Sequence, residues 1–590
     1  MTKFLLDLSF PSFSKVVRSA IAFNTNILVL TVGVLFTSFG VSVSKGVSAQ
    51  VPVQGKNGVV TTSQKYASEV GLQILKDGGN AVDAAVAVGY ALAVVDPCCG
   101  NLGGGGFMTI HLANGKNTFI NFREKAPLAA TPNLYLDHKG NVVPGLSTKG
   151  YLAVGVPGTV LGLDRALTEY GTMNRQQVIL PAIRLAEEGY ILQQGDITSL
   201  SSKTADFASQ PNVAAIFLKN ATTPYQVGDR LVQKNLAKTL KLIATKGPQA
   251  FYKGSIADEL VKASSQNHGI LTKKDLSDYN VEETRPVGCN YRGYNIISSP
   301  PPGGGTVLCE MLNILEGYPL SKLGFHSPVS VQRILETMLY AYADRNTFLG
   351  DPNFVKIPLE RLLSKDYAAS IRDKIPQSGA TPPCLVYSCT TKNEGTNTTH
   401  YSIVDKYGNA VAVTYTINAL FGSGVIAGNT GFLLNDEMDD FTSKSGTPNL
   451  FGLVQGSENA IQPGKRPQSS MSPTIVFKDG KVFMVTGSPG GSRITTIVLS
   501  VITNVIDYGF NIQEAVDSPR FHYQGLPNSI YLERGSLSPD TIQSLSQTGF
   551  KFGSETLKWG AAESILVDPR TGLLYGASDQ RRPASAAVAY

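Results

Sequence analysis

The chain has 590 residues, with 51 lysines and arginines against 45 aspartates and glutamates, a net charge of +6 at pH 7. Spread over this length, the excess is too mild to indicate a nucleic-acid partner or an anionic membrane surface, and no long run of one charge supports either. The length allows a large buried core, and about four domains of average size would fit into it.

The first 49 residues have the features of an export leader. Positive charge, a mostly apolar stretch and a small-residue cleavage site follow one another at Lys3, Lys15, Arg18, residues 27–43 and Val47-Ser48-Ala49. The basic segment is unusually long, so an uncleaved membrane anchor is the alternative. We therefore predict an exported protein, periplasmic or extracellular, with a membrane-anchored form as the second option.

Six cysteines are present, at Cys98, Cys99, Cys289, Cys309, Cys384 and Cys389. Export permits disulfides, and Cys384 and Cys389, five residues apart, are the first candidate pair; free or buried thiols are the alternative. No Cys-x-x-Cys motif is followed by a second cluster, and the six histidines are scattered. We therefore expect no structural zinc site.

Two helices are predicted early in the chain. Ser63 can cap a helix over residues 64–77, and Asn80 can cap a second one over 81–95, with Asp83 in the capping-box position. The second helix is apolar nearly all round and should be buried. Four glycines, Gly103 to Gly106, follow it. Because a strand follows them at 107–110, instead of the helix of a phosphate loop, they predict close backbone packing.

The next strand, residues 118–122, ends beside Arg123. This arginine is either a ligand-binding residue or a solvated one paired with Glu124. Residues 150–380 read mainly as helical scaffold, and 381–397 as a polar linker. Within the scaffold the elements predicted are helices at 160–170, 174–189, 307–315 and 329–346 and a strand at 294–298.

Residues 397–405 begin the most informative stretch. Alternating apolar residues on both sides of the turn at 406–409 predict a β-hairpin. Pairing Asp405 with Ala410 places Thr398 opposite Ile417 and Thr399 opposite Thr416, although a slip of one residue would change these partners.

A threonine hydroxyl is a poor nucleophile unless a base takes its proton. The α-amine of the same residue, with a pKa of about 7.7–8.0, can be that base. The amine exists only if the bond between Asn397 and Thr398 is cut. A polar linker that enters a strand at Thr398 suits such self-cleavage, but on spacing alone an ordinary threonine-rich hairpin is the better interpretation.

The last third of the chain supplies polar candidates. The acidic run at 435–440 is a solvated loop or a calcium site, although it lacks EF-hand spacing. A long loop at 442–465 suggests a lid. Strands are predicted at 474–477 and 482–486 and a helix at 492–508. Gly490 and Gly491, before that helix, suit an oxyanion hole, with a plain strand–helix turn as the alternative.

Four stretches together resemble γ-glutamyltranspeptidase: residues 398–402, 414–418, 466–474 and 487–493. The resemblance runs from about residue 55 to Tyr590. It implies the α/β fold of the N-terminal-nucleophile hydrolases, a four-layer α/β/β/α sandwich with two stacked antiparallel sheets. It also implies one interwoven unit, cut into a large fragment (50–397) and a small fragment (398–590) that stay together as a heterodimer.

The resemblance also assigns roles by position. Thr398 is the nucleophile and Thr416 supports it, while Gly490 and Gly491 fit the oxyanion hole. The glutamyl head is held by Arg123 at the α-carboxylate, by Glu437 and Asp440 at the α-ammonium group, and by Asn418, Ser469 and Ser470. Many bacterial relatives carry a tyrosine at the tip of the lid, where this chain has Phe451.

The implied activity is cleavage of glutathione and other γ-glutamyl compounds through a γ-glutamyl-Thr398 intermediate. Water or an amino-acid or dipeptide acceptor resolves this intermediate, and no cofactor, metal or nucleic acid takes part. Two rivals remain open. One is an acylase of the same architecture, and the other is a non-catalytic amino-acid-binding protein, which would not need a cleavable junction before Thr398.

Overall fold

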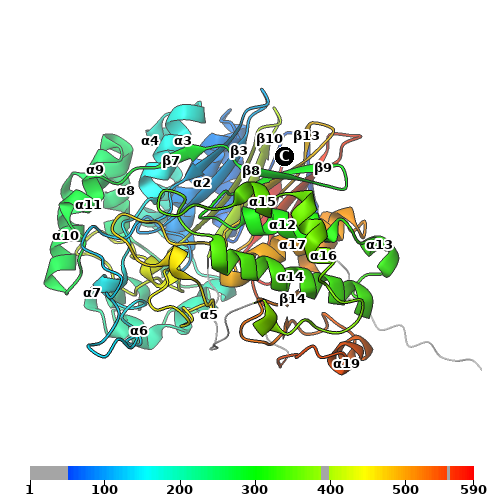
Figure 1. The fold of residues 1–590 in the computed structure, drawn as a ribbon. Coiled ribbons are helices and arrows are strands. Elements are labelled where there is room, and N and C mark those ends of the chain that lie inside the picture. The colour runs from blue at the N-terminus through cyan, green and yellow to red at the C-terminus, as the bar shows by residue number, and fades with distance from the viewer. Residues whose placement is uncertain (1–50, 387–397, 555–557) are drawn as a thin grey trace, which may run out of the picture. The chain divides into compact units, whose positions relative to one another are not determined.

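Two seven-stranded antiparallel sheets lie face to face at the centre of the protein (Figure 1). The computed structural model describes residues 51–386, 398–554 and 558–590. All of them belong to one unit, Ala49–Tyr590. The first sheet has the order β1 (Val53–Gly55), β17 (Leu574–Ser578), β16 (Glu563–Val567), β13 (Lys481–Thr486), β12 (Thr474–Lys478), β9 (Tyr294–Ser298) and β8 (Val287–Tyr291).

The second sheet carries the hairpin predicted from the sequence. Its order is β18 (Ala586–Ala589), β2 (Gly58–Thr62), β10 (Thr399–Asp405), β11 (Ala410–Thr416), β3 (Gly105–His111), β4 (Asn117–Asn121) and β7 (Glu282–Thr284). Apolar side chains fill the space between the two sheets, among them Val59, Val404 and Ala412 from the second sheet and Ile475, Val485 and Ile565 from the first. The hairpin strands β10 and β11 therefore lie in the interior, with neighbours on both sides.

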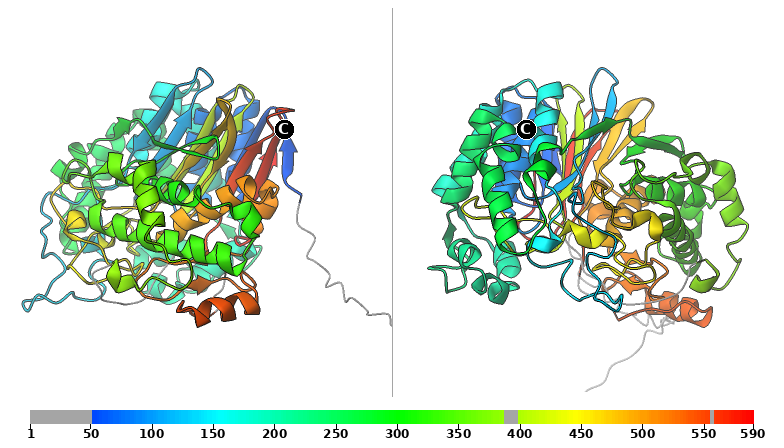
Figure 2. Two further views of the ribbon diagram at one scale, coloured as in Figure 1. Left: turned by 45° about the vertical axis from the view of Figure 1, so that its right-hand side comes forward. Right: turned by 60° about the vertical axis from the view of Figure 1, so that its left-hand side comes forward.

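Helices cover the outer face of each sheet, which completes the predicted four-layer sandwich (Figure 2). On the second sheet they include α1 (Lys65–Lys76), α2 (Ala81–Val95) and α3 (Thr159–Tyr170). Outside these, α4 (Arg175–Glu188) packs on α2, and α8 (Lys234–Lys246) packs on α4. On the first sheet they include α12 (Gly305–Leu315), α14 (Pro328–Phe348), α17 (Ile494–Ile506) and α18 (Ile512–Asp517). Every residue of α2 is buried, because this helix packs on β10 and β11 and is covered by α1 and α4.

The predicted helices and strands are present, with small shifts at their ends. Asn80 and Asp83 form the predicted capping box. The predicted cap of α1 is wrong: Gln64 caps it by accepting from the backbone N–H of Tyr66. Ser63 instead donates to Asp96 Oδ2 at 2.6 Å. The predicted helix at 492–508 opens with a short 3₁₀ turn, Gly491–Arg493, before α17 begins.

The hairpin register differs from the predicted one by one residue. Val404, and not Asp405, pairs with Ala410. Asp405 faces Asn409, whose carbonyl accepts from the Asp405 N–H at 3.1 Å, and the Asp405 carboxylate accepts from the N–H groups of Tyr407 and Asn409. The turn is therefore one residue tighter than expected, and it carries Gly408 with a φ of 91°.

The cysteine prediction is corrected in part. Cys98 is bonded to Cys99, and Cys289 is bonded to Cys309, so the alternative of free thiols is wrong for these four. The predicted Cys384–Cys389 pair includes Cys389, which lies outside the described residues, as does the leader at 1–49. Within the described ranges, no helix has the length and apolar character needed to cross a membrane.

Candidate active site

Thr398 lies at the entrance of β10, in the interior of the sandwich. Its side-chain oxygen donates to the hydroxyl of Thr416 at 3.4 Å, and both residues are almost fully buried. The corrected register explains this contact, because Thr399 pairs with Tyr415 and the preceding residue therefore faces Thr416. Thr416 Oγ1 also accepts from the N–H of Asn418 at 2.8 Å. A hydroxyl held by a second hydroxyl is a suitable place for an activated nucleophile.

The glycine run packs against this strand end, as predicted. A side chain on Gly104 would meet the carbonyl oxygen of Thr416 at 1.9 Å, and one on Gly103 would meet that of Leu433 at 2.1 Å. Gly104 can therefore approach the end of β11, and Gly103 the backbone of Leu433, only because they lack a Cβ atom. The glycine run thus packs closely against the backbone of Thr416, as the sequence predicts.

Arg123 lies in the same pocket and is buried, with 1% of its side chain exposed. Its guanidinium forms ion pairs with Glu437 and Asp440 and lies 3.6 Å from Glu124. The backbone carbonyl of Gln468 accepts a further hydrogen bond from it at 3.3 Å. The alternative of a solvated arginine is therefore wrong. The three acidic groups converge on one cation inside the protein.

Three carboxyl groups and one guanidinium are buried together in this cluster. Burial raises the pKa of Glu124 to about 7, and it raises the pKa of Glu437 well above its usual range, in both cases against the pull of Arg123. Burial lowers the pKa of Arg123, but the three carboxylates outweigh this and the net shift is upward. Glu437 Oε2 is buried without a hydrogen-bond partner among the described residues. The site is therefore suited to receive a further cationic group.

Asn418, Ser469 and Ser470 border the same pocket. Asn418 has a φ of 72°, a conformation that asparagine tolerates, and its amide donates to the carbonyl of Asp436 at 3.0 Å. Ser469 accepts from the N–H of Met471 at 3.1 Å. We call this space the enclosed pocket. Its lining includes Arg123, Arg345, Thr398, Thr416, Asn418, Glu437, Asp440, Asn449, Phe451, Gln455, Ser469, Ser470 and Gly491.

The enclosed pocket has a free volume of about 20 Å³. That is room for about one water molecule. The predicted lid forms one wall: Phe451 is buried and packs against Tyr342 and Leu453. Any larger ligand must therefore displace the lid or separate the ion pairs of Arg123.

Gly490 is the only sequence-predicted site residue of the described ranges that does not line the enclosed pocket. It borders a larger cavity, of about 490 Å³, which we call the outer cavity. Its walls include Ser63, Asp96, Cys98, Cys99, Pro489, Gly490, Lys558, Trp559 and Arg582. Gly490 and Gly491 thus lie between the two spaces, at the start of the turn that leads into α17.

Two arginines of the site were missed by the sequence analysis. Arg345, in the half assigned to scaffold, reaches the enclosed pocket from α14 and donates to Gln455 at 3.4 Å. Arg582 donates to the carbonyl of Thr398 at 2.8 Å and forms an ion pair with Asp96. Arg345 is in the last turn of a long helix and Arg582 is near the C-terminus, and neither stands in a motif that signals its role.

Comparisons with known proteins agree with this architecture. The family model of gamma-glutamyltranspeptidase matches residues 67–589. The chain is 56% identical over 552 residues to a glutathione hydrolase proenzyme of Pseudomonas sp. (strain A14), covering 92% of this chain and 96% of the relative. It is 50% identical over 544 residues to the glutathione hydrolase proenzyme of Escherichia coli (strain K12), covering 91% and 93%.

A solved structure extends the similarity to the whole fold. The cephalosporin acylase from Bacillus halodurans matches with a TM-score of 0.81 at 29% identity, covering 94% of this chain and 99% of that one. The stacked sheets and the threonine at the entrance of an inner strand define an enzyme of the N-terminal-nucleophile hydrolase class. Within that class, the chain belongs to the γ-glutamyltranspeptidase family.

Proposed function

We propose that this enzyme cuts itself before Thr398 and then transfers γ-glutamyl groups from glutathione and related donors to water, amino acids or dipeptides. The observation that carries the proposal is that Thr398 lines the same pocket as Arg123, Glu437 and Asp440. One cation and two anions match the charged groups of a glutamyl head. The relatives named glutathione hydrolase proenzymes support the same substrate class.

In the proposed self-cleavage, Thr398 Oγ1 attacks the carbonyl carbon of Asn397. The peptide bond to the Thr398 nitrogen breaks, an ester forms, and water hydrolyses it. This leaves a large fragment ending at Asn397 and a small fragment beginning with Thr398, which remain together because β10 and β11 lie between strands β2 and β3 of the large fragment. Thr416 supports the attacking hydroxyl by hydrogen bonding.

In the proposed transfer reaction, the new α-amine of Thr398 takes the proton of its hydroxyl as the oxygen attacks the γ-carbonyl carbon of the donor. The N–H groups of Gly490 and Gly491 stabilise the oxyanion. The ammonium form of the amine then protonates the leaving amine, and the γ-glutamyl ester on Thr398 remains. Water or an acceptor amine attacks this ester by the same steps.

Donor binding requires the enclosed pocket to open. We propose that the donor α-carboxylate takes a two-point contact with Arg123, displacing a carboxylate partner. Glu437 and Asp440, one of them freed from Arg123 in this way, then accept hydrogen bonds from the donor α-ammonium group. Asn418, Ser469 and Ser470 complete the contacts, Phe451 closes over them without the hydroxyl that a tyrosine would bring, and no cofactor or metal takes part.

A second candidate is an acylase that acts on another acyl amide, because the similar solved structure is a cephalosporin acylase. The two candidates are separated by assaying the purified enzyme on γ-glutamyl anilide and on anilides of uncharged acyl groups. Our proposal requires a strong preference for the γ-glutamyl compound, lost when its α-amine is acetylated. Equal rates on uncharged acyl anilides would favour the acylase.

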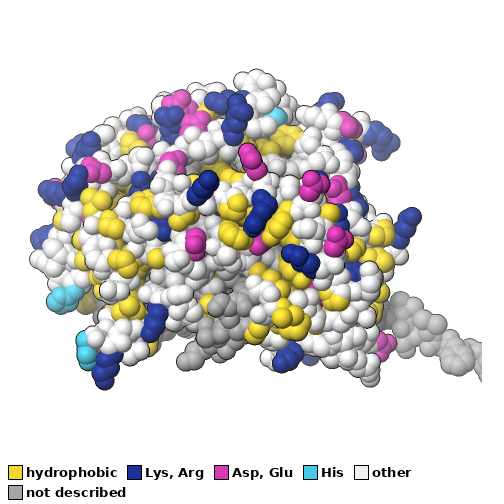
Figure 3. Space-filling view, in the orientation of Figure 1, with side chains coloured by type: hydrophobic (Ala, Val, Ile, Leu, Met, Phe, Trp, Pro, Cys, Tyr) yellow, Lys and Arg dark blue, Asp and Glu magenta, His cyan; other side chains and the backbone are white. Residues whose placement is uncertain are grey.

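We also propose that the protein is exported, either free in the periplasm or outside the cell or held by its leader. The features of residues 1–49 carry this proposal. On the face drawn in Figure 3, basic and acidic side chains are interspersed and neither sign gathers into one patch, in keeping with a small-molecule substrate and no nucleic-acid partner. Fractionation of cells that express the full chain, followed by detection of the small fragment, tests the location.

A further inference from the structure

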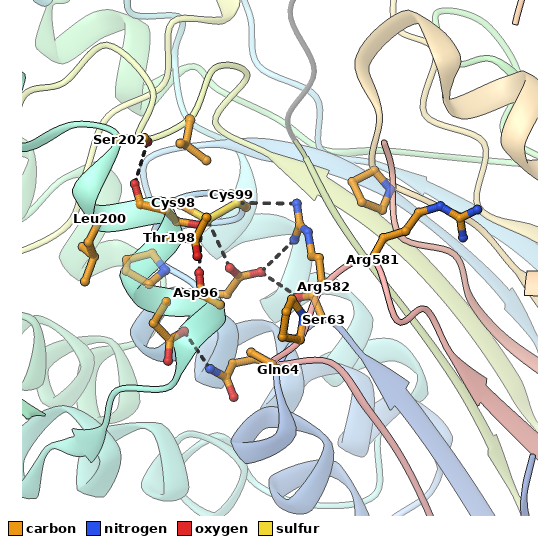
Figure 4. A pocket seen from close by; sticks show the side chains of 18 of the residues that line it. Ser63, Gln64, Asp96, Cys98, Cys99, Thr198, Leu200, Ser202, Arg581 and Arg582 are labelled. Carbon is orange, nitrogen blue, oxygen red and sulfur yellow. Dashed lines mark hydrogen bonds and ion pairs between the residues drawn. A yellow bond between two sulfur atoms is a disulfide. The ribbon is translucent and has the colours of Figure 1, made fainter. Parts of the chain in front are cut away.

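The disulfide between neighbouring residues Cys98 and Cys99 has no place in the reaction described above. It lies in the turn after α2, and both cysteines border the outer cavity (Figure 4). Both residues are little exposed, 5% and 2%, and among the described residues the outer cavity gives a route to the sulfur atoms. The cavity volume of about 490 Å³ lies within the range that small ligands occupy.

The groups around the two sulfur atoms fit a reduced pair. Cys98 Sγ lies 3.1 Å from Asp96 Oδ1, and Cys99 Sγ lies 3.7 Å from Arg582 Nη2. A disulfide has neither a proton to donate nor a charge to balance. In a dithiol, Cys98 would donate its S–H proton to Asp96, and a Cys99 thiolate would be stabilised by the guanidinium of Arg582. Figure 4 shows Arg582 between Cys99 and Asp96.

Asp96, Cys98 and Cys99 also have their ligand atoms within 4.8 Å of one another, a spacing that a metal ion could use. The sulfur atoms of a disulfide lack the thiolate charge that metal ligation needs. The pair as it stands in the structure, bonded as a disulfide, is therefore a poor metal ligand.

The backbone of the disulfide is hydrogen-bonded to the segment that follows Thr416. The carbonyls of Cys98 and Cys99 accept from the N–H groups of Phe421 and Ile417, at 2.8 and 3.3 Å. These bonds hold the segment that contains Asn418, in which both Asn418 and Phe421 have positive φ angles. Such conformations persist only where the surroundings hold them. Opening the disulfide would therefore release one support of the enclosed pocket.

We propose that Cys98–Cys99 is a thiol-exchange site, at which a low-molecular-weight thiol that enters the outer cavity modifies the enzyme and weakens its hold on the donor. An external thiolate attacks Cys98 Sγ, a new S–S bond forms there, and Cys99 leaves as a thiolate beside Arg582. A second thiolate can then release Cys98 as a thiol. The two external thiols end as one disulfide and supply the two electrons. Only the identity of the natural thiol rests on the proposed function, because glutathione, the proposed donor, and the product released from it both contain a thiol group.

The modification is tested by mass spectrometry with 2-mercaptoethanol, a thiol that is neither a γ-glutamyl donor nor an amine acceptor. The processed full-length enzyme is treated at pH 8, quenched with acid, alkylated and digested. We expect the mercaptoethanol adduct on Cys98 and the alkyl group on Cys99, before Cys289–Cys309 reacts. An unmodified Cys98–Cys99 pair at a stage when Cys289–Cys309 is already open would overturn the proposal.

The effect on binding is measured on the same samples with γ-glutamyl anilide. Losing one net hydrogen bond corresponds to roughly 1 kcal/mol, so KM should rise about fivefold, with reversal by the oxidant diamide. The Cys289→Ser/Cys309→Ser variant should respond as the native enzyme does, and Cys98→Ser/Cys99→Ser should not respond. An adduct with unchanged KM contradicts the proposed weakening. If the anilide is not cleaved at all, the proposed function fails, while the mass result still decides the exchange site.

Discussion

Arg123 and Glu437 form an ion pair inside the protein, each with 1% of its side chain exposed. Both side chains are almost fully removed from the surface, so each stabilises the charge of the other. Both residues also line the pocket in which Thr398 lies. The guanidinium of Arg123 therefore has two roles: it stabilises the buried carboxylates, and it is the proposed partner of the donor α-carboxylate. Substitutions at Arg123 should affect both the stability of the protein and the binding of the donor.

Replacing Arg123 with alanine should raise the donor KM strongly. Removing one partner of a buried charged pair has an effect on the order of 2–5 kcal/mol. Arg123→Lys should restore only part of the affinity, because one ammonium group cannot make the two-point contact. Steady-state kinetics on γ-glutamyl anilide measure this. If both variants kept the KM of the native enzyme, Arg123 would not be a donor-binding residue.

Replacing Thr416 with valine should slow both self-cleavage and turnover. The variant keeps the shape of the side chain but loses the hydroxyl that contacts Thr398 and Asn418. A loss of about 1–3 kcal/mol corresponds to a rate roughly fivefold to 150-fold lower. Thr416→Ser keeps the hydroxyl and serves as the control. If valine and serine behave alike in a time course of fragment formation and in kcat, the contact has no catalytic role.

His400 should make the protein less stable as the pH falls. It is buried between Thr414 and Ser402, and burial lowers its pKa to about 3. In the unfolded chain it takes up a proton near pH 6.5. The unfolded state thus binds more protons between these values, so the stabilisation is complete above about pH 6.5 and is lost as the pH falls toward 3.

His400→Gln should therefore flatten the fall in the free energy of unfolding between about pH 6 and pH 4, by roughly 1.4 kcal/mol per pH unit. Urea unfolding at several pH values measures it. His138→Gln, at an exposed position, is the control and should leave the slope unchanged. A slope that is the same in His400→Gln as in the native protein would contradict the buried, neutral histidine.

The ratio of the transfer product to the hydrolysis product should increase as the pH rises from about 7 to about 9. An acceptor attacks the γ-glutamyl ester only as a neutral amine, and dipeptide α-amines have pKa values of about 7.7–8.0. Water is available at every pH. The measurement is the ratio of γ-glutamyl-dipeptide to free glutamate at fixed donor and dipeptide concentrations. A flat ratio would show that acceptor ionisation does not control the partition.

Much of the architecture could be predicted from the sequence, because its signals are local. The Asn80–Asp83 capping box and the all-apolar α2 need only neighbouring residues. The predicted hairpin register was one residue off, although the alternation of apolar residues favours the observed one. With Val404 paired to Ala410, Ile403 lies opposite Val411, which puts both side chains on one face. Likewise, Ser63 was expected to cap α1, but its hydroxyl donates a hydrogen bond to Asp96, which is distant in the sequence.

The site residues that stand in sequence motifs could be predicted, and those that lie outside such motifs could not. The resemblance assigned Thr398, Arg123 and the acidic residues to one site, and the structure brings them to one pocket. Arg345 and Arg582 reach the site from distant parts of the chain, so only the fold reveals them. The pairing of Arg123 with Glu437 and Asp440 was also beyond the sequence, because these residues are more than 300 positions apart and only the fold brings them into contact.

The central claim is that Thr398 becomes the N-terminal residue of the small fragment. The most direct measurement is the intact mass of both fragments, with N-terminal sequencing of the small one. We expect a small fragment that begins with Thr398 and ends at Tyr590, and a Thr398→Ala variant that stays a single inactive chain. A small fragment that begins at another residue, or a Thr398→Ala chain that is still cut before residue 398, would contradict the account.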